Sequence, residues 1–143
     1  MKNNKKGFTL IELLVVIAII GLLSTLSILA LNTARARSRD ARRVADVKQI
    51  QTALEMYYND AGSYPANASV ASGLRLFRGS DTYLGAIPTP PSPSNDGSCT
   101  TPAPHYTYAV GTGNSTYTIT YCLGAAVNDI VAGWHTGTPA GIW

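Results

Sequence analysis

The residue most able to do chemistry in this sequence is Glu12, a single carboxylate inside a long apolar run. The run extends from Phe8 to Leu31 and otherwise contains apolar residues, small hydroxyl residues and Gly21. A charge inside a membrane segment costs about 2.5–3.5 kcal/mol on insertion scales, so such a group usually has a partner. A cut after Gly7 would free the α-amine of Phe8, and the amine of one copy could then neutralise Glu12 of a neighbour. The alternative is that Glu12 lies close enough to the membrane surface to stay hydrated or to be protonated.

Other residue types that catalyse reactions or bind metals are few and scattered. The two histidines, His105 and His135, have no metal-ligand spacing, and no phosphate loop, GxSxG or HExxH motif occurs. Residues 95–97 (Asn-Asp-Gly) and 128–129 (Asn-Asp) lack the alternating acidic pattern of a calcium loop and are better explained as turns. We therefore predict a protein that is not an enzyme, with no metal site and no cofactor.

Apolar periodicity indicates the element that positions Glu12. The apolar run is long enough to span a membrane, which takes about 20 residues. Beyond it, apolar residues recur at helical spacings of three and four, at Val44, Val47, Ile50, Leu54 and then Tyr57 or Tyr58. Gly62 and Pro65 then break the pattern, so we predict one helix from Phe8 to Asn59, roughly 75–80 Å long. Its first half needs lipid or other copies of itself, and its second half packs on a C-terminal head.

Residues 5–16, Lys-Lys-Gly-Phe-Thr-Leu-Ile-Glu-Leu-Leu-Val-Val, resemble the class III signal of type IV pilins and pseudopilins. The resemblance implies cleavage between Gly7 and Phe8 by a prepilin peptidase, followed by N-methylation of Phe8. It also implies assembly into a homo-oligomeric helical filament on an inner-membrane assembly platform. Glu12 matches the family glutamate that pairs with the N-terminal amine of an adjacent subunit.

The resemblance is close over about the first 30 residues, and the order of the later segments agrees with it. Gly21 matches a glycine where pilin helices often loosen in the filament. Leu29 stands where many pilins carry a proline. Extensive melting of the helix is therefore not expected in this protein.

The strand signal lies late in the chain. Residues 105–110 and 116–122 are rich in β-branched and aromatic residues, and residues 111–114 join them as a hairpin turn. One face of the second strand carries Tyr117, Ile119 and Tyr121. Two strands alone are only marginally stable, so a third is expected from about Tyr83–Ile87 or Asn128–Ala132.

The predicted fold class is α+β, a long N-terminal helix packed on a small antiparallel sheet, as in pilins. The segments are a leader (1–7), an apolar membrane or filament-core helix (8–31), the amphipathic half of the same helix (32–60) and a globular head (61–143). Within the head we predict an irregular loop at 66–98 and the sheet at about 105–132. The tail after Gly133 is Gly-, Thr- and Pro-rich, and we expect Trp134 and Trp143 to be exposed or docked on the sheet.

A basic block lies between the two halves of the helix. Its members are Arg35, Arg37, Arg39, Arg42 and Arg43, diluted by Asp40 and Asp46. The simplest interpretation is a solvated helix face with local pairs Asp40–Arg43 and Arg42–Asp46. Contacts with acidic groups on neighbouring subunits and phosphate binding, to lipid or nucleic acid, are the alternatives. Nucleic acid is possible but not indicated, because eight basic and eight acidic side chains remain once the three leader lysines are removed.

The same block bears on membrane orientation. Three leader lysines precede the apolar run and five arginines follow it, so the positive-inside rule would place the arginines in the cytoplasm. The resemblance implies the opposite, because the peptidase site must face the cytoplasm. We follow the resemblance and predict a single-pass inner-membrane precursor that becomes a cell-surface filament.

The two cysteines, Cys99 and Cys122, both lie in the C-terminal part. With an export signal ahead of them, we predict a disulfide formed in an oxidising compartment. Two reduced core cysteines are the alternative.

The function predicted from the sequence is structural, that of a pilin subunit in a type IV pilus-like filament. A major pseudopilin of a type II secretion system is the alternative within the same class. A monomeric binding module, signal-anchored or secreted, is the alternative of another class. A secreted module would use Ala34-Arg35-Ala36 as an ordinary signal cleavage site and begin near Ser38.

Overall fold

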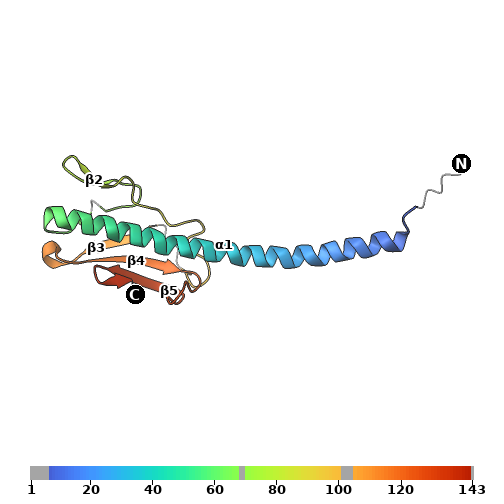
Figure 1. Cartoon of the computed structure of the whole chain (residues 1–143). Coiled ribbons are helices and arrows are strands. Elements are labelled where there is room, and N and C mark those ends of the chain that lie inside the picture. The colour runs from blue at the N-terminus through green and yellow to red at the C-terminus, as the bar shows by residue number, and fades with distance from the viewer. Residues whose placement is uncertain (1–6, 68–69, 101–104, 143) are drawn as a thin grey trace. The chain divides into compact units, whose positions relative to one another are not determined.

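The computed structural model describes residues 7–67, 70–100 and 105–142. The chain divides into two compact units, Met1–Arg35 and Ala36–Trp143. One helix, α1 (Leu10–Ala61), belongs in part to each unit (Figure 1). The predicted helix is confirmed, with each end two residues later than the sequence suggested.

The end of α1 is set by a glycine. Gly62 adopts a left-handed conformation, with φ at +70°, and its N–H donates to the carbonyl oxygen of Tyr58 at 2.8 Å. This is the αL type of helix cap, in which a residue without a Cβ satisfies a carbonyl that would otherwise lack a donor.

The second unit contains a four-stranded antiparallel sheet in the order β3-β4-β5-β6. Its strands are β3 (Thr107–Val110), β4 (Tyr117–Leu123), β5 (Gly133–Thr138) and β6 (Gly141–Ile142). A short 3₁₀ turn, η2 (Thr112–Asn114), joins β3 to β4, which confirms the predicted hairpin. A separate two-stranded sheet pairs β1 (Leu76–Arg78) with β2 (Asp81–Leu84).

The prediction for the third strand was wrong. The third strand is β5, which pairs with β4 on the side away from β3 and lies in the tail, beyond the predicted end of the sheet at about residue 132. Tyr83 belongs to the β1–β2 sheet, and Val127 forms only an isolated bridge with Ile130. Gly137 explains the error, because a Cβ at this position would lie 3.0 Å from Cγ1 of Val47. The glycine lets β5 approach the helix, yet in the sequence it weakens the strand pattern.

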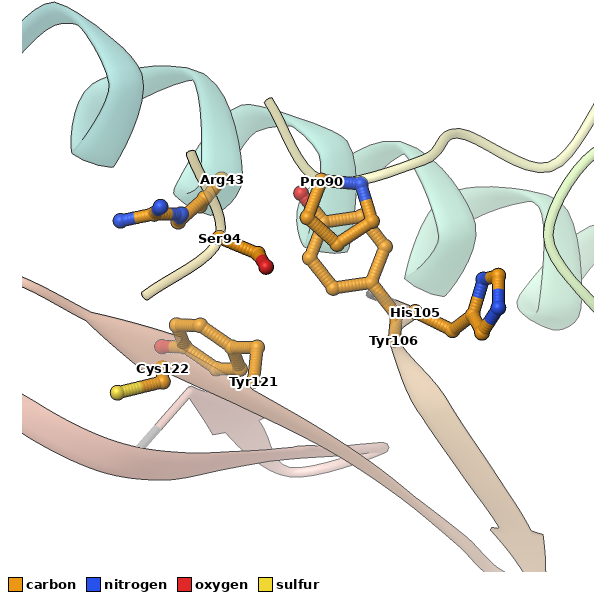
Figure 2. Close-up of a pocket in the computed structure, with 7 residues that line it drawn as sticks. All are labelled: Arg43, Pro90, Ser94, His105, Tyr106, Tyr121 and Cys122. Atoms are coloured by element: carbon orange, nitrogen blue, oxygen red, sulfur yellow. The ribbon is translucent and has the colours of Figure 1, made fainter. Parts of the chain in front are cut away.

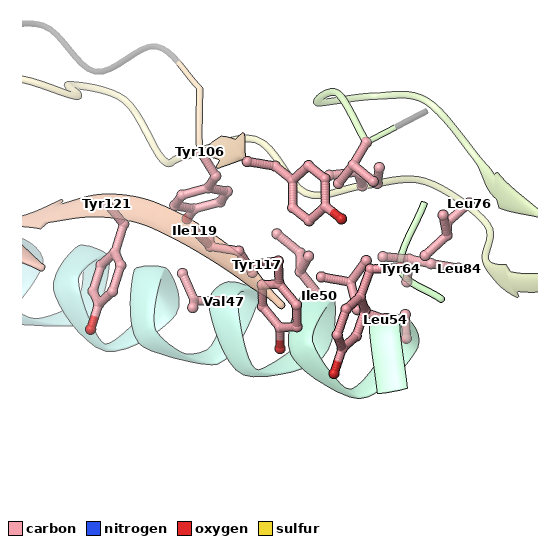
Figure 3. Close-up of a cluster of buried hydrophobic side chains, with 14 of the residues drawn as sticks. Val47, Ile50, Leu54, Tyr64, Leu76, Leu84, Tyr106, Tyr117, Ile119 and Tyr121 are labelled. Carbon is pink, nitrogen blue, oxygen red and sulfur yellow. The ribbon is translucent and has the colours of Figure 1, made fainter. Parts of the chain in front are cut away.

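The core of the second unit lies between α1 and the inner face of the sheet (Figure 3). The predicted helix stripe is confirmed, since Val47, Ile50 and Leu54 are almost completely buried. On the sheet, the predicted face of β4 is also buried, with Tyr117, Ile119 and Tyr121 each 1% exposed. Apolar contact along this stripe is therefore what holds the sheet on the helix.

Tyrosine hydroxyls from several parts of the head bind carboxylates of α1. Tyr106 donates to Asp46 at 2.8 Å, Tyr64 to Glu55 at 2.9 Å and Tyr83 to Asp60 at 2.9 Å; in addition, Tyr117 donates to Glu55 at 3.4 Å. Burial, together with the bonded carboxylate, raises the pKa of the Tyr106 and Tyr64 hydroxyls. The predicted Arg42–Asp46 pair is therefore wrong, because Asp46 is buried and Tyr106 is its partner.

Candidate functional site

The start of α1 places the one carboxylate of the apolar run at a helix cap. Thr9 precedes the first helical residue, and both its N–H and its hydroxyl donate to Oε2 of Glu12, at 2.8 and 2.7 Å. The N–H of Glu12 donates in return to the hydroxyl of Thr9 at 3.3 Å. This reciprocal arrangement is a capping box, which satisfies backbone donors that the first turn of a helix leaves free. The pattern Thr-x-x-Glu is the sequence signal for such a box, but the site predicted from the sequence did not include Thr9.

The residues around Glu12 present an apolar surface. Phe8, Ile11, Val15 and Val16 line a shallow hollow together with Glu12. From Phe8 to Leu31 the large apolar side chains remain between 47% and 88% exposed. Among the described residues, α1 is the one helix long and apolar enough to cross a membrane, and its apolar window has no buried part. A surface of this kind requires lipid or protein neighbours.

The other residues of the predicted processing and assembly site lie on the same unit. Gly7 and Phe8 precede the helix and are exposed, so the junction between them is accessible. Gly21 lies inside α1, and the helix continues through it without interruption. A Cβ at Gly21 would meet no atom within 4 Å, so the space beside this glycine is open.

The structure divides the basic block into two groups. Arg35, Arg37 and Arg42 are exposed. Arg43 is buried at 2% exposure and pairs with buried Asp40, while Arg39 is half-buried and binds Asp96 at 2.7 Å. The predicted Asp40–Arg43 pair is thus confirmed as a contact but is not solvated. Because the guanidinium groups of Arg39 and Arg43 are used inside the head, only the three exposed arginines remain candidates for contacts with other subunits or phosphate.

The carboxylates of Asp40 and Asp96 connect α1 to two segments of the head by hydrogen bonds and ion pairs. The two carboxylate oxygens of Asp40 accept the backbone N–H groups of Gly124 and Ala125, at 2.9 and 2.8 Å. Asp96 Oδ1 lies 2.8 Å from Nη2 of Arg43, whose guanidinium also donates to the carbonyl of Pro93. Burial raises the pKa of the Asp96 carboxyl, but the bonds from the two arginines outweigh it and hold that pKa below its usual range.

A small cavity lies next to this cluster, lined by Arg43, Pro90, Ser94, His105, Tyr106, Tyr121 and Cys122 (Figure 2). Its volume is about 10 Å³, which is room for about one water molecule. The hydroxyl of Tyr121 is buried and has no partner within the described part of the chain. Burial raises the pKa of Tyr121 to about 12. The cavity is too small for an organic substrate.

The cysteines, one histidine and one tryptophan of the described residues lie in or on the sheet region of the head. Cys99 and Cys122 form a disulfide with a Cα–Cα distance of 5.9 Å. His135 lies on β5 with its Nε2 2.8 Å from the carbonyl oxygen of Val131. Within the described residues, no three His, Cys, Asp or Glu side chains are grouped so that they could hold a metal ion. Trp134 is half exposed on β5, and Trp143 lies outside the described residues.

A capped, exposed apolar helix start and a small antiparallel sheet packed on the second part of the same helix together give an α+β, pilin-like fold. Residues 2–28 match the family described as the prokaryotic N-terminal methylation motif. Similarity to individual pilus and secretion proteins extends further along the chain, and no solved structure gives a significant match.

Three relatives illustrate the similarity. The chain is 44% identical over 74 residues to the type IV wide pilus major component of Thermus thermophilus, covering 52% of this chain and 56% of that protein. It is 46% identical over 55 residues to a type IV major fimbrial protein of Dichelobacter nodosus, covering 38% and 35%. It is 30% identical over 99 residues to the type II secretion system core protein G of Dickeya chrysanthemi, covering 66% and 56%. The chain thus spans between a third and somewhat more than half of the length of these relatives, and over that part it is similar to type IV pilus, fimbrial and type II secretion proteins.

Proposed function

We propose that this chain is a structural, non-enzymatic subunit of a type IV pilus-like filament. The exposed apolar half of α1 carries the proposal, because it has no burial of its own and one capped carboxylate. Helices of this kind pack through many small van der Waals contacts that add up over several neighbours. The pilus and fimbrial names of the relatives in Thermus and Dichelobacter support the same function.

In this proposal a prepilin peptidase cuts between Gly7 and Phe8, and the new amine of Phe8 is methylated. Within one subunit, Oε2 of Glu12 accepts both bonds from Thr9, while Oε1 makes no bond to any described residue. Oε1 is then available to the amine of an adjacent subunit. Only a neighbour at the correct stagger brings its amine to this oxygen, so Glu12 sets the register of assembly.

The proposed location follows from the same residues. The precursor crosses the inner membrane once, with the leader in the cytoplasm, and an assembly platform there moves it into a surface filament. Arg35, Arg37 and Arg42 are exposed, and they are our candidates for contacts with acidic groups of neighbouring subunits or with phosphate.

A major pseudopilin of a type II secretion system is the second candidate. The match to core protein G of Dickeya chrysanthemi favours it, because this alignment covers 66% of the chain and so reaches well into the head. Both candidates use the same helix and the same processing. They differ in the machinery that assembles the filament and in the length that the filament reaches.

The N-terminus and mass of the mature protein, purified from its native membrane, test the proposal directly. We expect a chain that begins at N-methylated Phe8. A chain that begins near Ser38 would show that the apolar run is a discarded signal sequence, and the filament proposal would then be wrong. A chain that keeps its leader would contradict processing by a prepilin peptidase.

A further inference from the structure

The head contains a pair of buried charges on α1 whose remaining hydrogen bonds and ion pairs come from residues far away in the sequence. Arg43 and Asp40 lie on α1 at 2% and 0% exposure. Separating such a pair from its partners is strongly destabilising, because a charge would remain buried without compensation. Asp40 obtains its further bonds from Gly124 and Ala125, and Arg43 from Pro93 and Asp96. Every one of these partners belongs to one of two segments, the loop at 93–99 or the segment at 122–125, where β4 ends and a loop begins.

These two segments are linked to each other by covalent and hydrogen bonds. The Cys99–Cys122 disulfide joins them, and the N–H of Ser98 donates to the carbonyl of Gly124 at 3.0 Å. The backbones pass so closely that a Cβ on Gly97 would lie 2.1 Å from the carbonyl oxygen of Gly124. Asp96 stands directly before this crossing, so the crossing fixes where its carboxylate lies.

We propose that the disulfide and the charged cluster form one redox-sensitive latch. In the oxidised head, the Cys99–Cys122 bond keeps Asp96 against Arg39 and Arg43 and keeps the N–H groups of Gly124 and Ala125 on Asp40. In the reduced head, the loop at 93–99 moves away and the helix turn at 39–43 loses its counter-charges. The helix then presents five arginines instead of three and becomes locally unstable. This inference concerns the head alone and does not depend on the proposed filament function.

The alternative is that the disulfide stabilises the head as a whole. A cross-link restricts the unfolded chain, and this would raise the stability of all parts of the head equally. The C-terminal end of α1 distinguishes a local latch from general stabilisation of the head. There, Glu55 and Asp60 are bound by Tyr64 and Tyr83, which lie outside the two linked segments at 93–99 and 122–125. Hydrogen exchange distinguishes local opening from global unfolding.

The first experiment measures amide hydrogen exchange in the full chain in detergent micelles, with and without reduction. Dithiothreitol reduces the disulfide to two thiols and is itself oxidised to its cyclic disulfide. We expect the amides of residues 39–44 to exchange roughly a hundredfold faster after reduction, and those of residues 54–58 to change by less than about threefold. Equal acceleration at both positions would overturn the latch.

The second experiment starts from the oxidised chain and measures how fast its disulfide is reduced, so it does not depend on the reduced head staying folded. Cys99 and Cys122 are buried, so dithiothreitol can reach the disulfide only when the head opens locally. Asp96→Asn should make this opening more frequent and so speed reduction of Cys99–Cys122 by about tenfold. It should also speed exchange at residues 39–44 in the oxidised chain. Asp81→Asn is the matched control, since it removes an exposed carboxylate from β2 and should change neither rate. An unchanged reduction rate in Asp96→Asn would show that the cluster and the disulfide are independent, which would overturn the proposal.

A double-mutant cycle completes the test. In the Cys99→Ser/Cys122→Ser chain, adding Asp96→Asn should change exchange at residues 39–44 by less than about twofold, because the latch is already open. If the effects of the two changes multiply, the disulfide does not act through Asp96 and the proposal is wrong.

Discussion

The two halves of α1 use the same backbone geometry but obtain their stability differently. From Leu10 to Leu31 the large apolar side chains of the helix are exposed. The hydrogen bonds of its polar side chains stay local, in the Thr9–Glu12 cap and from Ser24, Thr25 and Ser27 to backbone carbonyls three or four residues earlier. From Asp40 to Leu54 one face is buried by the sheet and two loops, and its charges are bound within the head. The first half therefore depends on surroundings outside the chain, and the second half depends on the fold of the head. Mutations in the first half should therefore change filament assembly, and mutations in the second half should change the stability of the head.

The largest expected effect is on assembly. Glu12→Ala should reduce filament recovered from the cell surface by at least about tenfold, because a neighbour's amine would enter the apolar core without a counter-charge. The thermal unfolding of the head should remain unchanged, since the hydrogen bonds of Glu12 within the described residues are all with Thr9. Glu12→Asp is the control that keeps the charge on a shorter side chain. Normal filaments from Glu12→Ala would contradict the proposed role of this residue.

A mutation in the second half of α1 should change the stability of the head. Leu54→Ala should lower the free energy of unfolding by about 2–5 kcal/mol, because it removes a fully buried side chain from the seam between helix and sheet. Leu26→Ala is the matched change in the first half, where the side chain is 58% exposed, and should leave the unfolding of the head unaltered. Denaturant titration of the two variants measures the difference. Equal losses would mean that the two halves do not differ as described.

High pH should weaken the second half alone. Burial raises the pKa of several tyrosines above the ordinary value of about 10, so the folded head favours their neutral form. The corresponding stability is present below about pH 10 and is lost as the pH rises through the folded-state values. We expect the melting temperature to fall steadily above about pH 10, with tyrosine ionisation followed by ultraviolet absorbance. A melting temperature constant up to pH 12 would contradict the burial of these hydroxyls.

The smallest expected effect concerns an exposed hydrogen bond. Tyr83→Phe removes the bond to Asp60, which lies at the surface, so the loss in unfolding free energy should be about 0.5–1 kcal/mol. Tyr106→Phe removes the buried bond to Asp46 and should cost about 1–3 kcal/mol, since the carboxylate then remains buried without its donor. Comparing the two by denaturant titration measures the contribution of burial. A reversed order would show that Asp46 finds another partner.

Much of this architecture was predictable because local patterns are sufficient for it. Three sequence features predict the helix, and each depends only on residues close to it in the chain. They are the continuous apolar run, the helical spacing from Val44 to Leu54 and the glycine at position 62. The hairpin of β3 and β4 was predictable for the same reason, since its turn and its alternating faces are local features. Glu12 could be identified as the candidate assembly residue because one charge in an apolar run stands out without any structure.

Other features depended on residues that are far apart in the sequence. β5 was missed because Gly137 is explained only by Val47, which lies ninety positions earlier on the helix. The prediction of a solvated basic block was wrong for Arg39 and Arg43, because both bind Asp96, which lies fifty-seven residues after Arg39. Sequence alone therefore determined the helix, its apolar half and its single carboxylate, which are set by local periodicity and solvation. The tertiary structure alone decided which charges are buried, because burial depends on where distant loops return to the helix.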